Sequence, residues 1–147
     1  MNKKDLKIDF VDFYKGFDKK NNDFYKILSK KYNVIISDSP DYIFYSCFGH
    51  EYLKYDCVRI FYTGECIVPN FNECDYSIGF DRLDFSDRYL RVPLYRLLQY
   101  GKETREIVSR DVFTEEDLKE KTGFCNFLYS NCFAQDRRTD IFHKLSE

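Results

Sequence analysis

The sequence of 147 residues contains no long apolar run and no long basic run. A helix that crosses a bilayer needs roughly 20 consecutive apolar residues, so no transmembrane segment is expected. Residues 1–7 are rich in charge and lack the apolar core and small-residue cleavage site of a signal peptide. The net charge is −2, and without a basic cluster we expect no nucleic-acid partner. These absences predict a cytoplasmic protein.

Two sequence motifs, one typical of paired cysteines and one typical of metal binding, are also absent. The six cysteines are widely spaced, with no Cys-x-x-Cys pair, so reduced thiols are expected. There is no Asp-x-Asp pair, which would be the usual sign of a metal ion bridging a diphosphate. We therefore assign no metal-binding residues and leave open whether a divalent metal takes part.

Short runs of apolar and β-branched residues are present throughout the first 80 positions. Hydrophobic residues make up 44% of the sequence, which is enough for the core of one domain. The strand–helix–strand start and the continuously apolar strands predict an α/β fold, a Rossmann-like parallel sheet with flanking helices. The expected strands are residues 6–13, 34–36, 42–45, 58–62 and 76–80.

The expected helices follow from apolar spacing and capping residues. Phe24, Ile27, Leu28 and Tyr32 recur at helical spacing after a cap at Asn21 or Asn22. Residues 86–91 are charged and expected at the surface, and Pro93 is suited to begin a helix that Gly101 ends.

The main boundary is expected between residues 101 and 123. Residues 101–113 are polar, and Thr114 to Asp117 matches a capping box that begins a helix to about Lys121. A strand over 124–129 and a helix over 137–145 are expected to follow. This predicts a first domain over 1–105, a linker with a short helix over 106–122, and the start of a second domain over 123–147.

Acidic and polar side chains follow the expected strand ends. Glu65 lies on a glycine-containing turn just after residues 58–62, and ligands of open α/β sheets bind at the carboxyl ends of strands. A carboxylate there can accept a proton from a weak nucleophile. From position alone Glu65 is better explained as an exposed turn residue or as the cap of a helix N-terminus, because acidic residues are common near turns. Asp81 and Tyr62 are candidates for contact with a ligand at the same edge of the sheet. The alternative for Asp81 is a solvated acid in a turn, and the alternative for Tyr62 is an aromatic residue of the core.

A second group of candidates follows the expected strand over 124–129. Ser130 and Asn131 come before the expected helix, and Arg137 stands at its beginning. Helix N-termini bind phosphate through free backbone amides, and an arginine adds a bidentate charged contact. An asparagine cap beside a solvated arginine is the alternative.

Several segments in a fixed order carry a family resemblance. Together they resemble bacterial α-1,3-fucosyltransferases of glycosyltransferase family 10, over roughly the last two-thirds of the chain. The segments are Phe61-Tyr-Thr-Gly-Glu65, Val68-Pro-Asn-Phe71, Asp75-Tyr-Ser-Ile-Gly-Phe-Asp81, Arg88-Tyr-Leu-Arg-Val-Pro-Leu-Tyr95 and Phe124-Cys-Asn-Phe-Leu-Tyr-Ser-Asn131 with Arg137.

The resemblance implies a fold, a reaction and residue roles. It implies the N-terminal, acceptor-side half of a GT-B glycosyltransferase, followed by the start of the donor-side half. Fucose would pass from GDP-fucose to a hydroxyl of an N-acetyllactosamine-like glycan containing N-acetylglucosamine, with inversion. It implies that Glu65 is the general base and that Ser130, Asn131 and Arg137 contact the diphosphate side of GDP-fucose.

The sequence also departs from the family pattern. The family's donor-side motif, similar to Gly-Tyr-Val-Thr-Glu-Lys, does not occur. We therefore expect that this polypeptide alone does not transfer fucose and is a fragment of a fucosyltransferase. One alternative is a free-standing module that binds an acceptor glycan or a partner chain. Another is an α/β domain whose turn acids have no role. We leave open whether a further C-terminal region attaches the enzyme peripherally to a membrane.

Overall fold

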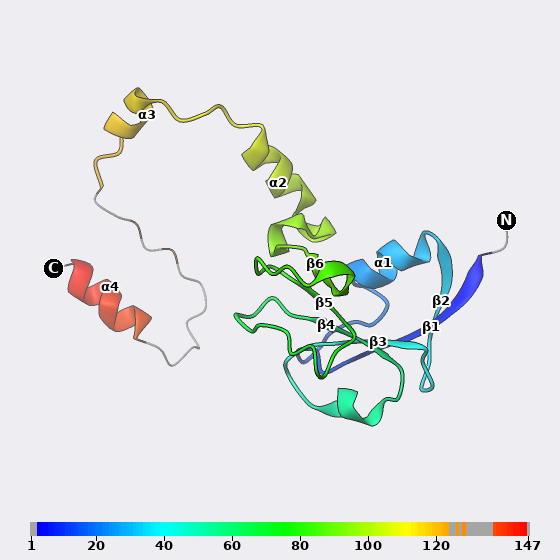
Figure 1. The fold of residues 1–147 in the computed structure, drawn as a ribbon. Coiled ribbons are helices and arrows are strands. Elements are labelled where there is room, and N and C mark those ends of the chain that lie inside the picture. The colour runs from blue at the N-terminus through cyan, green and yellow to red at the C-terminus, as the bar shows by residue number, and fades with distance from the viewer. Residues whose placement is uncertain (1–2, 124–125, 127, 129–136, 147) are drawn as a thin grey trace. The chain divides into compact units, whose positions relative to one another are not determined.

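The computed structural model describes residues 3–123, 126, 128 and 137–146 (Figure 1). The chain divides into two compact units, Met1–Ser109 and Arg110–Glu147. The first unit contains a six-stranded sheet, and the second contains short helices. The predicted assignment of residues 1–105 and 123–147 to two functional domains stays a prediction.

The sheet of the first unit is parallel throughout, in the order β2-β1-β3-β4-β5-β6. The predicted fold class, an α/β protein with a parallel sheet, is confirmed. Its strands are β1 (Lys4–Val11), β2 (Tyr32–Ile36), β3 (Tyr42–Tyr45), β4 (Val58–Tyr62), β5 (Tyr76–Gly79) and β6 (Tyr89–Arg91).

The strand order reverses between β1 and β3. From β1 the chain passes through α1 (Asp23–Ser29) to β2 on one side, and β3 then returns to the other side of β1. Figure 1 shows α1 and the 3₁₀ helix η1 (Glu51–Lys54), which follows β3, on opposite sides of the sheet. Connections that diverge in this way leave a crevice beyond the carboxyl ends of the two strands.

Each face of the sheet has its own hydrophobic cluster. On one face Ile8, Phe10 and Phe44 are buried against Phe24 and Leu28 of α1. On the opposite face the cluster comprises Ile43, Tyr45, Phe61, Tyr52 of η1 and Cys74. Because both faces are covered, the strands are apolar on both sides, which explains their continuous hydrophobic runs.

The first helix begins where it was predicted to begin, but it ends earlier than predicted. The Asn22 side chain accepts a hydrogen bond from the backbone N–H of Tyr25 at 2.9 Å, which caps α1. The helix ends at Ser29, and Tyr32, predicted on its apolar face, instead begins β2 opposite Lys4 of β1. Pairing with β1 decides the conformation of Tyr32, which helical spacing alone does not reveal.

The segment after Pro93 differs from the prediction. Two 3₁₀ turns, η3 (Leu94–Arg96) and η4 (Leu98–Tyr100), replace the expected helix, because Leu97 between them is extended with ψ of 150°. Gly101 begins α2 (Gly101–Val108) rather than ending a helix. The first eight residues of the expected polar linker over 101–113 therefore form a helix, which was not predicted. Lysine, glutamate and arginine favour the helical conformation, so a polar segment rich in them can form a helix and need not be a linker.

The sixth strand was not predicted. Residues 86–91 lie at the surface as expected, but they form the 3₁₀ helix η2 (Ser86–Arg88) and then β6. β6 pairs with β5 in parallel, with Ile78 opposite Leu90. As an edge strand with Leu90 58% exposed, it lacks the apolar pattern of the central strands.

The second unit confirms two predicted helices. Thr114 and Asp117 form the capping box at the start of α3 (Glu115–Lys119). The helix predicted over 137–145 is α4 (Arg138–Ser146). Residues 124, 125, 127 and 129 of the predicted strand lie outside the described residues.

Arg88 holds the segment between β4 and β5 in place, and its removal should destabilise the fold. Its Nε donates to the carbonyl of Asp75 at 2.7 Å, and Nη2 donates to the carbonyls of Cys74 and Phe71 at 2.7 and 3.0 Å. Arg88→Ala is expected to lower the free energy of unfolding by about 1–2 kcal/mol, since partly exposed hydrogen bonds are lost. Urea unfolding measures the change, with Arg82→Ala at an exposed position as the control. Equal stability of the two variants would contradict this role.

Candidate active site

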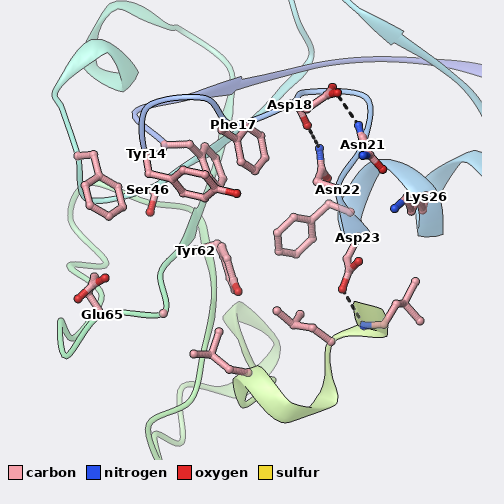
Figure 2. A pocket seen from close by; sticks show the side chains of 17 residues that line it. Tyr14, Phe17, Asp18, Asn21, Asn22, Asp23, Lys26, Ser46, Tyr62 and Glu65 are labelled. Atoms are coloured by element: carbon pink, nitrogen blue, oxygen red, sulfur yellow. Dashed lines mark hydrogen bonds between the residues drawn. The ribbon is translucent and has the colours of Figure 1, made fainter. Parts of the chain in front are cut away.

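A pocket of about 540 Å³ lies in the crevice where the strand order reverses, and we refer to it as the switch-point pocket. The loops after β1, β3 and β4 line it, together with leucines of the 94–98 segment. Figure 2 shows Tyr14, Ser46, Tyr62 and Glu65 around this pocket. Its position at the carboxyl ends of the strands is the usual ligand site of open α/β sheets.

Glu65 reaches the switch-point pocket from a turn that the chain fixes locally. After β4, the hydroxyl of Thr63 accepts a hydrogen bond from the Glu65 backbone N–H at 3.0 Å. The Glu65 carbonyl accepts from the N–H of Ile67 at 2.7 Å. A Cβ at Gly64 would lie 3.1 Å from Cδ2 of Leu94, so glycine lets this leucine approach the turn. The backbone of Glu65 is held while its side chain stays exposed.

The Glu65 carboxylate is available for chemistry. Within the described residues it has no hydrogen-bond or ion-pair partner, and it lies at the margin of the pocket (Figure 2). A carboxylate that no protein donor occupies can accept a hydrogen bond, and then a proton, from a ligand hydroxyl. The geometry therefore fits a general base.

Aromatic rings form one wall of the pocket. Phe13 and Phe17, from the loop after β1, stack with their centroids 4.0 Å apart, and Tyr14 meets Phe17 edge-on at 5.7 Å. Tyr14 is 57% exposed, so its ring is accessible to a ligand. Burial raises the pKa of Tyr62, which keeps its hydroxyl protonated as a donor. Rings that carry a hydroxyl suit a ligand with both C–H faces and polar groups.

The polar residues at the other margin mostly hold the loop together. Asp18 accepts from the backbone N–H groups of Lys20 and Asn21, at 2.8 and 3.1 Å. Asp23 accepts from the N–H of Leu98 at 2.7 Å, which ties the 94–98 segment to the start of α1. Within the described residues the side chains of Asn21 and Lys26 make no hydrogen bond, which leaves them available to a ligand.

The structure brings two of the predicted site residues together and not the others. Tyr62 and Glu65 both line the switch-point pocket. Asp81 does not line it, and its carbonyl accepts from the Tyr89 hydroxyl at 3.0 Å in the turn after β5. Its contact with an acceptor stays a prediction.

The predicted donor-side residues fall in the second unit. Ser130 and Asn131 lie outside the described residues. Arg137 is exposed directly before α4, and its carbonyl accepts from the N–H of Ile141 at 3.0 Å. Their roles toward GDP-fucose stay predictions.

Sequence reasoning missed the residues that form most of the pocket wall. Tyr14, Phe17, Ser46 and Phe48 come from loops after β1 and β3, whose adjacency depends on the strand order. One signal was present, since aromatic residues at 13, 14 and 17 interrupt an otherwise polar loop. Because binding residues lie disproportionately on loops, aromatic residues there were a signal of packing or of ligand binding.

The described part of the chain contains neither a cluster of metal ligands nor a helix suited to span a membrane. Among these residues no group of three or more histidine, cysteine, aspartate or glutamate side chains is arranged to hold a metal ion. The helices described here are too short or too polar for any of them to cross a bilayer.

Comparison with known proteins identifies the family. Residues 8–98 match the family model described as the N-terminal domain of the α-(1,3)-fucosyltransferase FucT, so the chain belongs to this family of glycosyltransferases. The chain is 47% identical over 124 residues to the α-(1,3)-fucosyltransferase FucT of Helicobacter pylori. That alignment covers 79% of this chain and 25% of the relative, so the chain spans about a quarter of the relative's length. The family resemblance inferred from the sequence is confirmed.

Solved structures agree with this assignment. An α1,3-fucosyltransferase crystallised with GDP-fucose is 37% identical, with a TM-score of 0.56 over 69% of this chain and 30% of its own. A second α1,3-fucosyltransferase structure is 33% identical, with a TM-score of 0.57 over 82% of this chain and 38% of its own. The fold class expected for the N-terminal half of a GT-B glycosyltransferase is thereby confirmed.

Proposed function

We propose that this chain provides the acceptor side of an α-1,3-fucosyltransferase and that Glu65 is its general base. The observation that supports the proposal most directly is the position of Glu65. Its exposed carboxylate, without a partner among the described residues, lies in the switch-point pocket. The chain belongs to a family named for this transfer, and a relative was solved with GDP-fucose.

The proposed reaction is a direct displacement. A hydroxyl of the acceptor sugar gives its proton to Glu65 as its oxygen attacks the anomeric carbon of fucose. The bond between that carbon and the phosphate oxygen of GDP breaks, and GDP leaves with the electron pair. Attack from the side opposite the leaving group inverts the anomeric configuration. Glu65 then releases its proton to water.

The acceptor proposed for the switch-point pocket is a glycan containing N-acetylglucosamine. The Tyr14 ring presents an exposed apolar surface against which the C–H groups of a pyranose can pack. The protonated Tyr62 hydroxyl and the side chains of Asn21 and Lys26 offer hydrogen bonds to sugar hydroxyls. A contact of Asp81 with the acceptor belongs to the same proposal.

The donor side of the proposal rests on the second unit. Ser130, Asn131 and Arg137 are proposed to contact the diphosphate of GDP-fucose, with Arg137 supplying positive charge beside the start of α4. The expectation that these 147 residues alone transfer no fucose stays a prediction. A cytoplasmic location, with or without peripheral attachment to a membrane, is proposed as well.

A chimera tests the proposed function. Residues 8–98 of this chain would replace the aligned segment of the Helicobacter pylori enzyme, which supplies a donor side. We expect the chimera to transfer fucose from GDP-fucose to N-acetyllactosamine, measured by release of GDP and by mass of the product. A folded chimera that binds the acceptor but transfers no fucose would favour a non-catalytic glycan-binding module instead.

A further inference from the structure

The 94–98 segment lies against the turn that carries Glu65. A Cβ added at Gly64 would stand 3.1 Å from Cδ2 and 3.4 Å from Cδ1 of Leu94, so both methyl groups of this leucine contact the turn. Groups packed this closely cannot move independently of one another. The position of Leu94 therefore limits the position of the Glu65 backbone.

Packing and local hydrogen bonds do little to attach the 94–98 segment to the rest of the unit. The side chains of Leu94 and Leu98 are 41% and 51% exposed, so each buries only part of its apolar surface. Among the groups that the structure describes, the backbone–backbone hydrogen bonds of the segment are local, as from the Leu97 N–H to the Leu94 carbonyl at 3.0 Å. Such bonds determine the shape of the segment and do not join it to the sheet.

Asp23 supplies the missing attachment. Its Oδ2 accepts a hydrogen bond from the Leu98 backbone N–H at 2.7 Å, across 75 positions of the sequence (Figure 2). Asp23 is the first residue of α1, and the packing of Phe24 and Leu28 against the buried cluster of the sheet fixes that helix. Hydrogen bonds to a carboxylate are stronger than those between neutral groups. One charged contact thus joins α1 to the segment that packs on the Glu65 turn.

The residues of this connection all belong to the switch-point pocket. Asp23, Leu98, Leu94, Gly64 and Glu65 line it in turn. After burial, the charge of Asp23 is the next cause that raises the pKa of Tyr62, which places the Asp23 carboxylate close to this wall of the pocket. Loss of the contact between Asp23 and Leu98 would therefore change the position of the proposed base and not only the stability of the fold.

We propose that Asp23 is a positioning residue of the transfer reaction. Through Leu98 and Leu94 it holds the Glu65 turn where the carboxylate meets the acceptor hydroxyl, and it exchanges no proton itself. The inference rests on the proposed function, because it takes Glu65 as the general base. A base must lie within hydrogen-bond distance of the proton that it accepts, so a small displacement of the turn lowers the rate.

Amide exchange with water, followed by NMR in the 147-residue chain, tests the connection directly. In Asp23→Ala the Leu98 amide should exchange at least about fivefold faster, and the amide signals of Gly64 and Glu65 should shift. Asp23→Asn removes the negative charge from the start of α1 but keeps an acceptor oxygen, so most of the protection should remain. Unchanged exchange at Leu98 and unchanged signals at Glu65 in Asp23→Ala would overturn the inference.

The fucosyltransferase chimera measures the effect on transfer, since residues 8–98 contain both ends of the connection. Asp23→Ala should lower kcat about 5- to 20-fold, and Asp23→Asn should restore it to within about threefold. In a Glu65→Gln chimera the further change Asp23→Ala should have no effect on kcat, because no base is left to position.

The outcomes separate this inference from the proposed function. An equal fall of kcat on Asp23→Ala with and without Glu65 would overturn the positioning role and leave the assignment of the base intact. A folded Glu65→Gln chimera with undiminished kcat would overturn the assignment of the base and the positioning role together.

Asp75→Ala is the matched control for a merely structural role. The Asp75 Oδ2 accepts from the Arg59 backbone N–H at 2.8 Å, which is the same kind of bond. Asp75 is exposed, stands directly before β5 and does not line the switch-point pocket. Its loss should lower stability to a similar extent but leave Leu98 exchange and kcat unchanged. A fall of kcat as large as that in Asp23→Ala would overturn the inference.

Discussion

Replacing Glu65 by glutamine is expected to lower kcat of the fucosyltransferase chimera by about 10²–10⁴-fold, the usual contribution of a general base. Glutamine keeps the size and polarity of the side chain but cannot accept the proton of the attacking hydroxyl. Such a loss corresponds to about 3–5 kcal/mol of transition-state stabilisation. The KM for the acceptor should change little, because Glu65 acts on the proton during transfer. Steady-state kinetics with GDP-fucose and N-acetyllactosamine measures both constants.

Two comparisons make the Glu65 result decisive. Glu51→Gln in the same chimera is expected to retain full turnover, since Glu51 lies on η1 with its carboxylate 2.6 Å from Lys54 Nζ. The Glu65→Gln chain should also keep the fold, because only the backbone groups of Glu65 hold the turn. A folded Glu65→Gln chimera with undiminished kcat would refute the assignment of the base.

Asp12→Ala is expected to lower the free energy of unfolding by about 2–4 kcal/mol, as hydrogen bonds to a charged group are lost. The Asp12 carboxylate accepts from the backbone N–H groups of Glu51 and Tyr52, at 3.0 and 2.9 Å. These amides belong to η1, so Asp12 joins the end of β1 to the helix after β3. Asp12 also has a φ of 58°, a left-handed conformation that aspartate tolerates better than alanine. Urea unfolding followed by circular dichroism measures the change.

Asp12→Asn and Gly49→Ala complete this test. Asparagine tolerates the left-handed conformation and keeps one acceptor oxygen, so its loss of stability should be clearly smaller. Gly49→Ala should destabilise the fold by displacing Asp12, because an added Cβ would meet the Asp12 carboxylate oxygen. Equal stability of Asp12→Ala and the unmodified chain would contradict the role of this carboxylate.

Local features of the fold could be predicted where neighbours along the chain determine them. Asn22 caps α1 and Thr114 forms the capping box of α3, because these hydrogen bonds join residues only three apart. The central strands were recognised because burial on both faces requires continuous apolar runs. Gly101 was misassigned, since glycine is found at either end of a helix and local pattern does not decide between them.

The functional site, too, has features that the sequence alone determines and features that only the tertiary structure decides. The sequence alone determined that Glu65 follows a buried strand on a glycine turn, and its motifs determined the family. Only the tertiary structure decided that loops after β1 and β3 meet around Tyr62 and Glu65, because their adjacency depends on strand order. It also decided that Asp81 lies outside the pocket and that Asp12, Tyr52 and Glu73 form one chain of hydrogen bonds. Contacts across 40 residues depend on the pairing of strands, which no local pattern encodes.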